Sequence, residues 1–330
     1  MPWGAGLLYA VRVMKRALMV GLLGLVSGAQ AAYCFDAPAE ADDFFRFMKG
    51  APRQMEQVIE QSGAPEKLIL QVSFQQQRLA EILQLSRSPE RTRLDQLIAF
   101  KQLGNRSEGQ LALPDDESFG LPLNERIRLT RLKAQRGGGI PLKFSSTFDA
   151  QGRLIRYSGM LLRQGLMVPR PLNVSCVYGR GVVIETVNIE HEYRAVLTAK
   201  FDAQGRLLLI DAATQWYNGP LDMTTFRPAF NPEVYTSRTV FEYSANGELK
   251  AAKFHIPVER DASGQLVERG QPEIEAQFTV DQAGNILRED ALAGGQRSTV
   301  EFTYDPKGNW VKRVFRAPGQ TVTITRTFTY

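Results

Sequence analysis

The sequence predicts an α+β protein, predominantly antiparallel β, in which a small N-terminal helical domain precedes a curved, multi-stranded sheet built from repeated hairpins. Three observations predict this fold: helical spacing of apolar residues before about residue 103, a short turn phrase that recurs after residue 147, and strict alternation in the last ten residues. A chain of 330 residues exceeds the usual size of one core. We therefore predict a signal peptide at 1–31, a helical domain at 33–135 and a repeat domain at 136–330.

The first residues have the features of a secretory signal. Arg12, Lys15 and Arg16 form a basic start, residues 17–26 are a short apolar run, and a small-x-small pattern ends at Ala31. The apolar run is shorter than the about 20 residues that a membrane-spanning helix needs. We expect cleavage near Ala31, no stable membrane span, and a periplasmic or secreted protein.

Charge excludes one class of partner. Residues 1–31 hold three basic and no acidic residues, so the exported chain keeps 37 of 40 Lys+Arg against 35 Asp+Glu, a formal net charge of +2. Nucleic acid needs a concentrated basic face, and none is indicated. The densest basic cluster is predicted to be a solvated helix or strand face; it consists of Arg126, Arg128, Arg131, Lys133 and Arg136.

The helical domain is predicted from apolar stripes and capping residues. Four helices are expected, at 39–49, 52–61, 65–85 and 88–103. The fourth has the clearest bounds, because Ser88 suits the N-cap, Pro89 the first turn, and Gly104 the position just past the end. Leu94 and Leu97 lie three residues apart on its apolar stripe.

A turn phrase then recurs: an aromatic or apolar residue, Asp, two free positions, Gly, one free position and a large apolar residue. Asp accepts a backbone hydrogen bond two residues on, and Gly supplies the positive φ that closes a type I turn with a bulge. The predicted turn residues are Asp149, Gly152, Asp202, Gly205, Gly247, Asp261, Gly264, Asp281, Gly284, Asp305 and Gly308. Each copy therefore predicts one hairpin.

The last residues predict a strand. Val322, Ile324, Arg326, Phe328 and Tyr330 point one way, and the threonines between them point the other. Together with the hairpins this implies about a dozen strands, more than a flat open sheet usually holds, so curling or closure of the sheet is expected.

The repeated phrase resembles the YD repeat of the Rhs-like proteins, most closely in residues 304–310, Tyr-Asp-Pro-Lys-Gly-Asn-Trp. The resemblance covers about residues 142–330. It implies a β-strand-rich extracytoplasmic protein that forms a shell or scaffold, in some members around a toxin and in others with carbohydrate binding. The irregular spacing of the copies and the lack of a shell-closing segment or toxin tail favour a small curved sheet.

Cys34 and Cys176 are the two cysteines of the chain. An oxidising compartment predicts a disulfide between them, with two free thiols or pairing between chains as the alternatives. Tyr33 stands where a lipoprotein signal needs a small residue, which excludes lipidation of Cys34.

No catalytic residue, metal site or cofactor is predicted. His191 and His255 each lie inside an expected strand, without a second His or Cys at metal-ligand spacing. The Gly-x-Ser-x-Gly elbow of serine hydrolases is absent around Ser175. The turn aspartates lack the carboxylate density that calcium needs. A carboxylate pair brought together by folding stays an open alternative to a non-enzyme.

These observations predict an exported, non-catalytic envelope protein that binds a glycan or a protein, or acts as a scaffold, through its hairpin surface. Trp216, Tyr217 and Trp310 are the candidate ligand contacts, with core packing as the other interpretation of each. The alternative function is an accessory, neutralising or chaperone-like partner of a secreted toxin or secretion system. Outer-membrane insertion is disfavoured because Arg326 interrupts the apolar face of the last strand and because the expected helical N-terminal domain does not fit such a protein.

Overall fold

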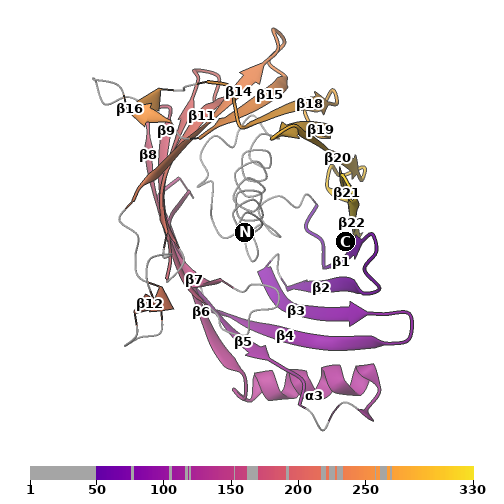
Figure 1. Ribbon diagram of the computed structural model, residues 1–330. Coiled ribbons are helices and arrows are strands. Elements are labelled where there is room, and N and C mark those ends of the chain that lie inside the picture. Colours follow the sequence, from indigo (N-terminus) through magenta and orange to yellow (C-terminus); the bar gives the residue numbers. More distant parts are fainter. Residues whose placement is uncertain are drawn as a thin grey trace. The chain divides into compact units, whose positions relative to one another are not determined.

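A computed structural model describes residues 50–330 apart from short internal gaps. The gaps are residues 76–77, 104–105, 116–117, 119, 152, 162–169, 191–192, 217–220, 223–226, 229–232, 257, 261–265 and 268–269. The described chain forms two compact units. Figure 1 labels their helices and strands. The first unit contains residues 148–156 and 173–286, and the second contains residues 50–147, 157–172 and 287–330. The predicted signal peptide at 1–31 lies outside the described residues and stays a prediction.

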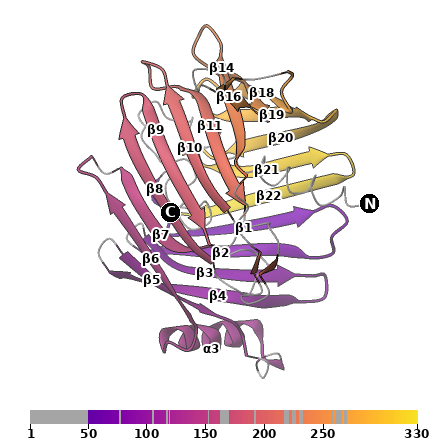
Figure 2. The same cartoon turned by 60° about the vertical axis from the view of Figure 1, so that its left-hand side comes forward.

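The first unit is built from antiparallel strands in the order β9, β10, β11, β14, β15 and β18. Their bounds are β9 (Val182–Ile189), β10 (Tyr193–Phe201), β11 (Leu207–Trp216), β14 (Tyr235–Tyr243), β15 (Leu249–His255) and β18 (Ile274–Val280). Figure 2 shows β9, β10 and β11 side by side. Four two-residue strands form two small hairpins: β12 (Leu221–Asp222) with β13 (Arg227–Pro228), and β16 (Glu259–Arg260) with β17 (Leu266–Val267). Strands β7 (Leu154–Leu161) and β8 (Arg170–Gly179) have residues in both units.

The second unit combines strands from the two ends of the described chain. The earlier segment holds β1 (Gln54–Gln61), β2 (Lys67–Gln75), β3 (Arg78–Arg87), β4 (Thr92–Leu103), β5 (Arg106–Ala112), α3 (Leu123–Gln135) and β6 (Ile140–Phe148). The later segment holds β19 (Ile286–Ala293), β20 (Gln296–Tyr304), β21 (Trp310–Ala317) and β22 (Gln320–Thr329). The predicted final strand is therefore observed as β22.

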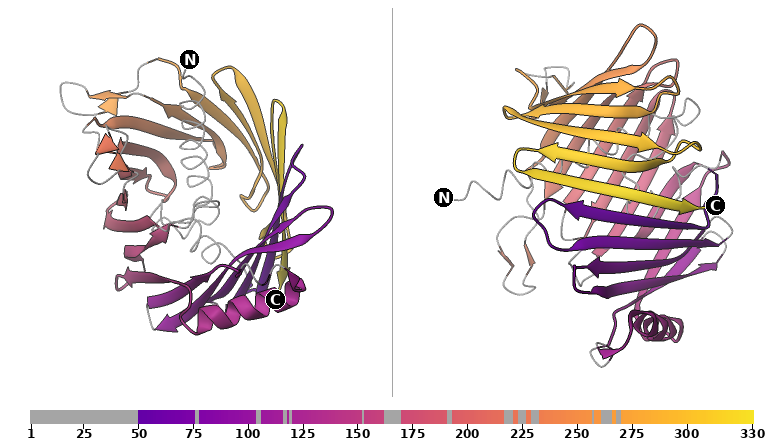
Figure 3. Two further views of the ribbon diagram at one scale, coloured as in Figure 1. Left: turned by 60° about the horizontal axis from the view of Figure 1, so that its bottom comes forward. Right: turned by 90° about the vertical axis from the view of Figure 1, so that its right-hand side faces the viewer.

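The first and last strands of the described chain are neighbours. β1 pairs with β22 along its whole length, from Gln54 opposite Thr329 to Gln61 opposite Val322. The N–H of Arg53 extends this ladder with a hydrogen bond of 2.6 Å to the carbonyl of Thr329. In the right-hand view of Figure 3 the yellow β22 lies beside the indigo β1. The second unit can therefore fold only when β1 and β22, which are far apart in sequence, come together.

The predicted combination of a helical N-terminal domain and a curved sheet is wrong. Within the residues that the structure describes, α3 is the one α-helix, and the segments predicted as helices at 52–61, 65–85 and 88–103 are strands. The helix predicted at 39–49 lies outside the described residues. No helix in the described part of the chain is both long enough and apolar enough to cross a membrane.

A β-bulge explains the misleading helical spacing in β4. Leu85 pairs with Leu94 and Gln84 pairs with Gln96, so Asp95 is an extra residue in the ladder. Leu94 and Leu97 are three residues apart and yet lie in the same buried cluster. A bulge adds one residue to the period of two, and the resulting spacing of three imitates one face of a helix.

Helix α3 packs against β4 and β5 and covers the apolar cluster there. Ala134 of the helix is buried with Leu97 and Ala112 of these strands. The predicted basic cluster lies on this helix, and its charges are largely paired. Arg131 donates to both carboxylate oxygens of Glu81, at 2.6 and 2.7 Å, and Lys133 pairs with Asp115.

Candidate functional site

The repeated Asp residues build the hairpin turns. Asp202 Oδ1 accepts hydrogen bonds from the backbone N–H of Gln204 at 2.9 Å and of Arg206 at 2.8 Å. The N–H of Asp202 donates to the carbonyl of Arg206, and Gly205 closes the turn with a φ of 79°. The ladder slips between Lys200 and Phe201, where the bulge lies. This is the turn with a bulge that the phrase predicts.

The same geometry recurs in the other Asp copies. Asp149, Asp281 and Asp305 each accept an N–H from two residues on, at 2.9–3.0 Å, and from four residues on, at 2.8 Å. Ser244 replaces Asp in one copy, and its Oγ accepts the N–H of Glu248 at 3.2 Å. The turn residues Gly152, Asp261 and Gly264 lie outside the described residues. The glycines Gly205, Gly247, Gly284 and Gly308 all have a φ between 79° and 82°.

The second carboxylate oxygen of each turn Asp also has a partner. Arg153 Nε donates to Asp149 Oδ2 at 2.6 Å, and Arg206 Nε donates to Asp202 Oδ2 at 2.6 Å. Asn285 Nδ2 bonds Asp281 Oδ2 at 2.8 Å. These carboxylates are therefore engaged on both oxygens by the protein itself.

Their ionisation agrees with this role. Partial burial raises the pKa of Asp202, but the hydrogen bonds from the N–H and side chain of Arg206 outweigh it, so the pKa lies below its ordinary value. For Asp281 the bond from the Asn285 side chain is the main cause of a lowered pKa. A general acid needs a raised pKa, so these aspartates suit turn building rather than proton transfer.

Tyrosines connect one turn to the next strand. Tyr178 donates its hydroxyl to the carbonyl of Leu154 at 2.8 Å, and Tyr243 donates to the carbonyl of Leu207 at 2.9 Å. In both cases the accepting residue comes directly after an Asp turn. Tyr243 is also the aromatic residue that opens the following copy, at 243–249. Burial, followed by the charge of Asp202, raises the pKa of Tyr243 to about 12, so it stays a donor.

Arginine side chains fill the space between Asp and Tyr in two of these turns. The guanidinium of Arg153 lies 4.3 Å from the centre of the Tyr178 ring, and that of Arg206 lies 5.1 Å from the Tyr243 ring. Each Arg therefore joins an ion pair to a cation–π contact. The arrangement fixes the turn end of the first unit.

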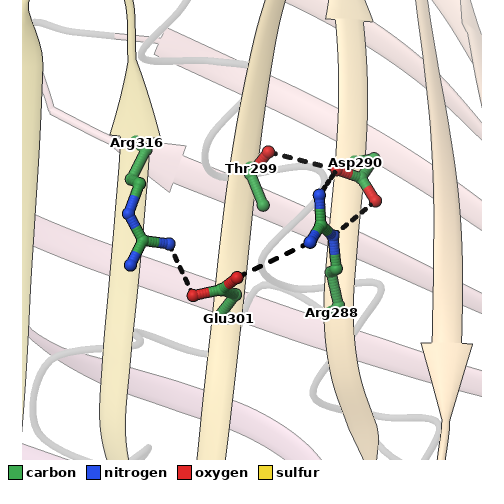
Figure 4. A network of polar contacts seen from close by, with 5 residues as sticks. All are labelled: Arg288, Asp290, Thr299, Glu301 and Arg316. Atoms are coloured by element: carbon green, nitrogen blue, oxygen red, sulfur yellow. Dashed lines mark hydrogen bonds and ion pairs between the residues drawn. The ribbon is translucent and has the colours of Figure 1, made fainter.

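A ladder of charged side chains crosses β19, β20 and β21 in the second unit (Figure 4). Arg288 donates to both oxygens of Asp290, at 2.7 and 2.8 Å, and lies 3.6 Å from Glu301. Arg316 binds the other oxygen of Glu301 at 2.5 Å, and Thr299 donates to Asp290 at 3.1 Å. This strand face is therefore charged and its side chains are paired with one another.

The second unit also holds a buried carboxylate. Glu289 is 7% exposed, and burial raises its pKa to about 7 against the opposing attraction of Arg313. Burial likewise lowers the pKa of Arg313, whose guanidinium lies 5.5 Å from the Phe302 ring. Perturbed carboxyl groups occur at catalytic sites, but they also occur in structural ion pairs. The adjacent Asp290 has a lowered pKa, chiefly because the side chain of Arg288 donates to it.

No group of three or more His, Cys, Asp or Glu side chains that could hold a metal ion occurs among residues the structure describes. His255 is buried in β15, whereas His191 lies outside the described residues. Cys176 is buried in β8 and Cys34 lies outside the described residues, so the predicted disulfide stays a prediction.

Of the three predicted ligand contacts, two can be placed. Trp216 is half-buried at the end of β11, and Tyr217 lies outside the described residues. Trp310 begins β21 with the guanidinium of Arg326 stacked 3.6 Å from its ring centre. Arg326 Nε also donates to Gln57 Oε1 at 2.9 Å. The structure does not bring Trp216 and Trp310 together in one compact unit.

Comparison with known proteins finds only structural matches of low score and low sequence identity. No family model and no curated protein matches the chain. A porin-like protein from Bacteroides uniformis ATCC 8492 is 8% identical with a TM-score of 0.41, over 85% of this chain and 98% of its own. A porin-like protein from Bacteroides vulgatus ATCC 8482 is 10% identical with a TM-score of 0.37, over 83% and 97%. The complex TcdB2-TccC3-Cdc42 matches at 11% identity and a TM-score of 0.16, over 76% of this chain and 15% of that one. Scores this low assign neither a family nor a function.

Of the residues at the other end of the first unit, the sequence interpretation named Trp216 and missed Val234 and Tyr235. Turns 202–206 and 244–248 lie at one end of the antiparallel ladder, so the end of β11 and the start of β14 lie at the other. There Val234 is 51% exposed and Tyr235 is 42% exposed. One feature of the sequence could have located this end of the unit. Segments 217–234 and 256–273 separate the regular hairpins and are too long to be single hairpin turns.

Proposed function

We propose that this protein is an exported envelope protein that binds a glycan or protein partner on a rigid β-hairpin scaffold and carries out no catalysis. One observation carries the proposal. In the turn aspartates Asp202 and Asp281, both carboxylate oxygens accept hydrogen bonds from residues of the same turn, and the pKa of each carboxyl group is lowered. We therefore interpret the repeated Asp turns as features that make the hairpins rigid.

Rigidity has a functional use in binding. A scaffold whose turns are fixed presents its other connections at constant positions, and binding residues are frequently found on such connections. The charged ladder on β19–β21 and the export predicted from the sequence agree with a protein that works in an aqueous envelope compartment.

The test is crosslinking in cells followed by recovery of the tagged protein from the envelope fraction, with mass spectrometry of proteins and glycans. An unrelated tagged periplasmic protein of similar size is the control. Enrichment of a glycan, or of one stoichiometric protein that is neither a toxin nor a secretion component, over that control supports the proposal. A dominant secreted toxin or a secretion component among the recovered proteins would favour the accessory function instead.

Catalysis is tested separately. The purified chain is incubated with glycans and peptides, and products are followed by mass spectrometry. Turnover that disappears on Glu289→Gln would replace the binding proposal with a hydrolase, because Glu289 is a buried carboxyl group with a raised pKa. We expect no turnover.

A further inference from the structure

The end of the first unit opposite the Asp turns gathers two long connections at one strand. Residues 217–234 lead directly into β14, and residues 256–273 follow β15, which pairs with β14. Thr236 ties the second connection to the first: its Oγ1 donates to the carbonyl of Val258 at 2.6 Å, and the N–H of Val258 donates to the carbonyl of Thr236 at 3.3 Å. Val258, which follows β15, is therefore held at the start of β14.

Exposed aromatic and apolar side chains stand at the start of β14. Val234 and Tyr235 are among the large apolar residues with high exposure. Thr214 pairs with Tyr235, so Trp216, two residues further along β11, lies diagonally beside Tyr235 on the same face of the sheet. The Tyr235 hydroxyl donates to a carboxylate oxygen of Glu233 at 2.8 Å, which holds the ring in place.

We infer that Trp216, Tyr235 and Glu233 form a glycan-binding surface at this end of the first unit. This inference rests on the proposed binding function and gives it a ligand class and a place. A ring with an apolar face and a polar edge packs on the C–H face of a sugar, while a carboxylate accepts hydrogen bonds from sugar hydroxyls.

At the Asp-turn end of the same strands, the carboxylates already have hydrogen-bond partners within the protein. The turn carboxylates are occupied by backbone N–H groups and by Arg or Asn side chains. Leu208 is exposed there, at the start of the same strand that ends with Trp216. Leu208 thus provides a matched control: an exposed large side chain on β11 outside the inferred surface.

The test titrates the purified chain with chitohexaose, cellohexaose, maltohexaose and solubilised peptidoglycan strands, using calorimetry and tryptophan fluorescence. We expect saturable binding to at least one of these probes. Tyr235→Ala is expected to weaken it at least tenfold, whereas Leu208→Ala leaves it unchanged. Thermal unfolding checks that each variant folds, and Tyr235→Phe, which keeps the ring, is expected to retain most of the affinity.

Failure of this inference can be told from failure of the proposed function. If none of the probes binds, or if Tyr235→Ala binds as the parent does, the inferred surface is wrong. If a protein partner recovered from cells is lost with Tyr235→Ala, the glycan class is overturned. If the parent and Tyr235→Ala recover the same glycan from cells in the same amount, the binding function stands and the surface falls.

Discussion

Tyr243 donates its hydroxyl to the backbone carbonyl of Leu207, 36 residues earlier in the chain. Leu207 follows the Asp202 turn, and Tyr243 opens the next turn phrase. The bond therefore joins two copies of the repeat that are not adjacent in the sequence. Each copy is a hairpin that is marginal by itself, and contacts between neighbours supply the stability.

Removing this hydroxyl should weaken the first unit. We expect Tyr243→Phe to lower the free energy of unfolding by about 1–2 kcal/mol, since the buried carbonyl of Leu207 loses its donor while the ring stays. Urea denaturation followed by circular dichroism measures the change. The matched control is Tyr235→Phe, whose hydroxyl bonds an exposed Glu233 and whose removal should leave no measurable difference. Equal effects of the two variants would show that the bond between copies contributes little.

The backbone angle at the turns gives a second prediction. Gly284 has a φ of 81°, and a Cβ at this position would meet no atom within 4 Å. Gly284→Ala should therefore cost roughly 1–2 kcal/mol through left-handed strain alone. Gly284→Asn should cost less, because Asn tolerates this region. Gly120, with open space around it and an ordinary φ, is the control for the Gly-to-Ala change.

The hairpins could be predicted from the sequence because their information is local. Within seven residues, Asp202 supplies the acceptor, Gly205 the positive φ, and the flanking apolar residues the strands. The observed hydrogen bonds at four Asp copies match that interpretation. Trp216 was predicted as a ligand contact, but Tyr235 was not, because its place beside Trp216 depends on which strands pair at a distance.

The N-terminal strands were mistaken for helices for a physical reason. The bulge at Asp95 brings Leu94 and Leu97 to one face, and Ile98 is buried as well. Helix α3 covers one side of β4, so buried residues no longer alternate strictly. A strand covered on both faces and interrupted by a bulge loses the period of two that identifies strands in sequence. The pairing of β1 with β22 has no local signal at all.

Core packing beneath α3 provides a third prediction. Leu97 is fully buried in β4, in the cluster that contains Ala134 of the helix. Leu97→Ala should destabilise the second unit by about 2–5 kcal/mol, because it removes buried methyl groups and leaves a cavity. Leu129→Ala, on the exposed side of α3, is the control and should change stability little. If Leu97→Ala behaves like the control, β4 does not face the helix as described.

The turn at Asp305 predicts how the stability of the protein changes at low pH. Burial opposes the ionisation of Asp305, but the Tyr330 hydroxyl and the N–H of Asn309 outweigh it, so its pKa lies below the ordinary value. A carboxyl group with a lowered folded pKa stabilises the fold above its unfolded pKa of about 4, and this contribution is lost as the pH falls through the folded value. Asp305→Asn keeps an acceptor for the turn and removes the charge. Its stability should fall less steeply than that of the parent between pH 5 and 2, about the range in which carboxyl groups take up protons.

The raised pKa of Glu289 predicts the opposite effect of pH on stability: its contribution should decrease as the pH rises. Its folded pKa of about 7 exceeds the ordinary value of 4.5, so the folded state binds a proton that the unfolded state has released. Stability should therefore be greatest at or below pH 4.5 with respect to this group, and should fall as the pH rises to about 7. The shift corresponds to about 3 kcal/mol as an upper limit.

Glu289→Gln isolates this effect. The variant cannot ionise at residue 289, so we expect it to be more stable than the parent at pH 8 and close to the parent at pH 4.5. Unfolding by urea at several pH values measures the difference. Glu301→Gln serves as the control, because Arg316 lowers the pKa of Glu301 and its contribution runs in the other direction. A constant difference between Glu289→Gln and the parent across this range would mean that Glu289 is ionised throughout, held by Arg313 more strongly than its burial opposes.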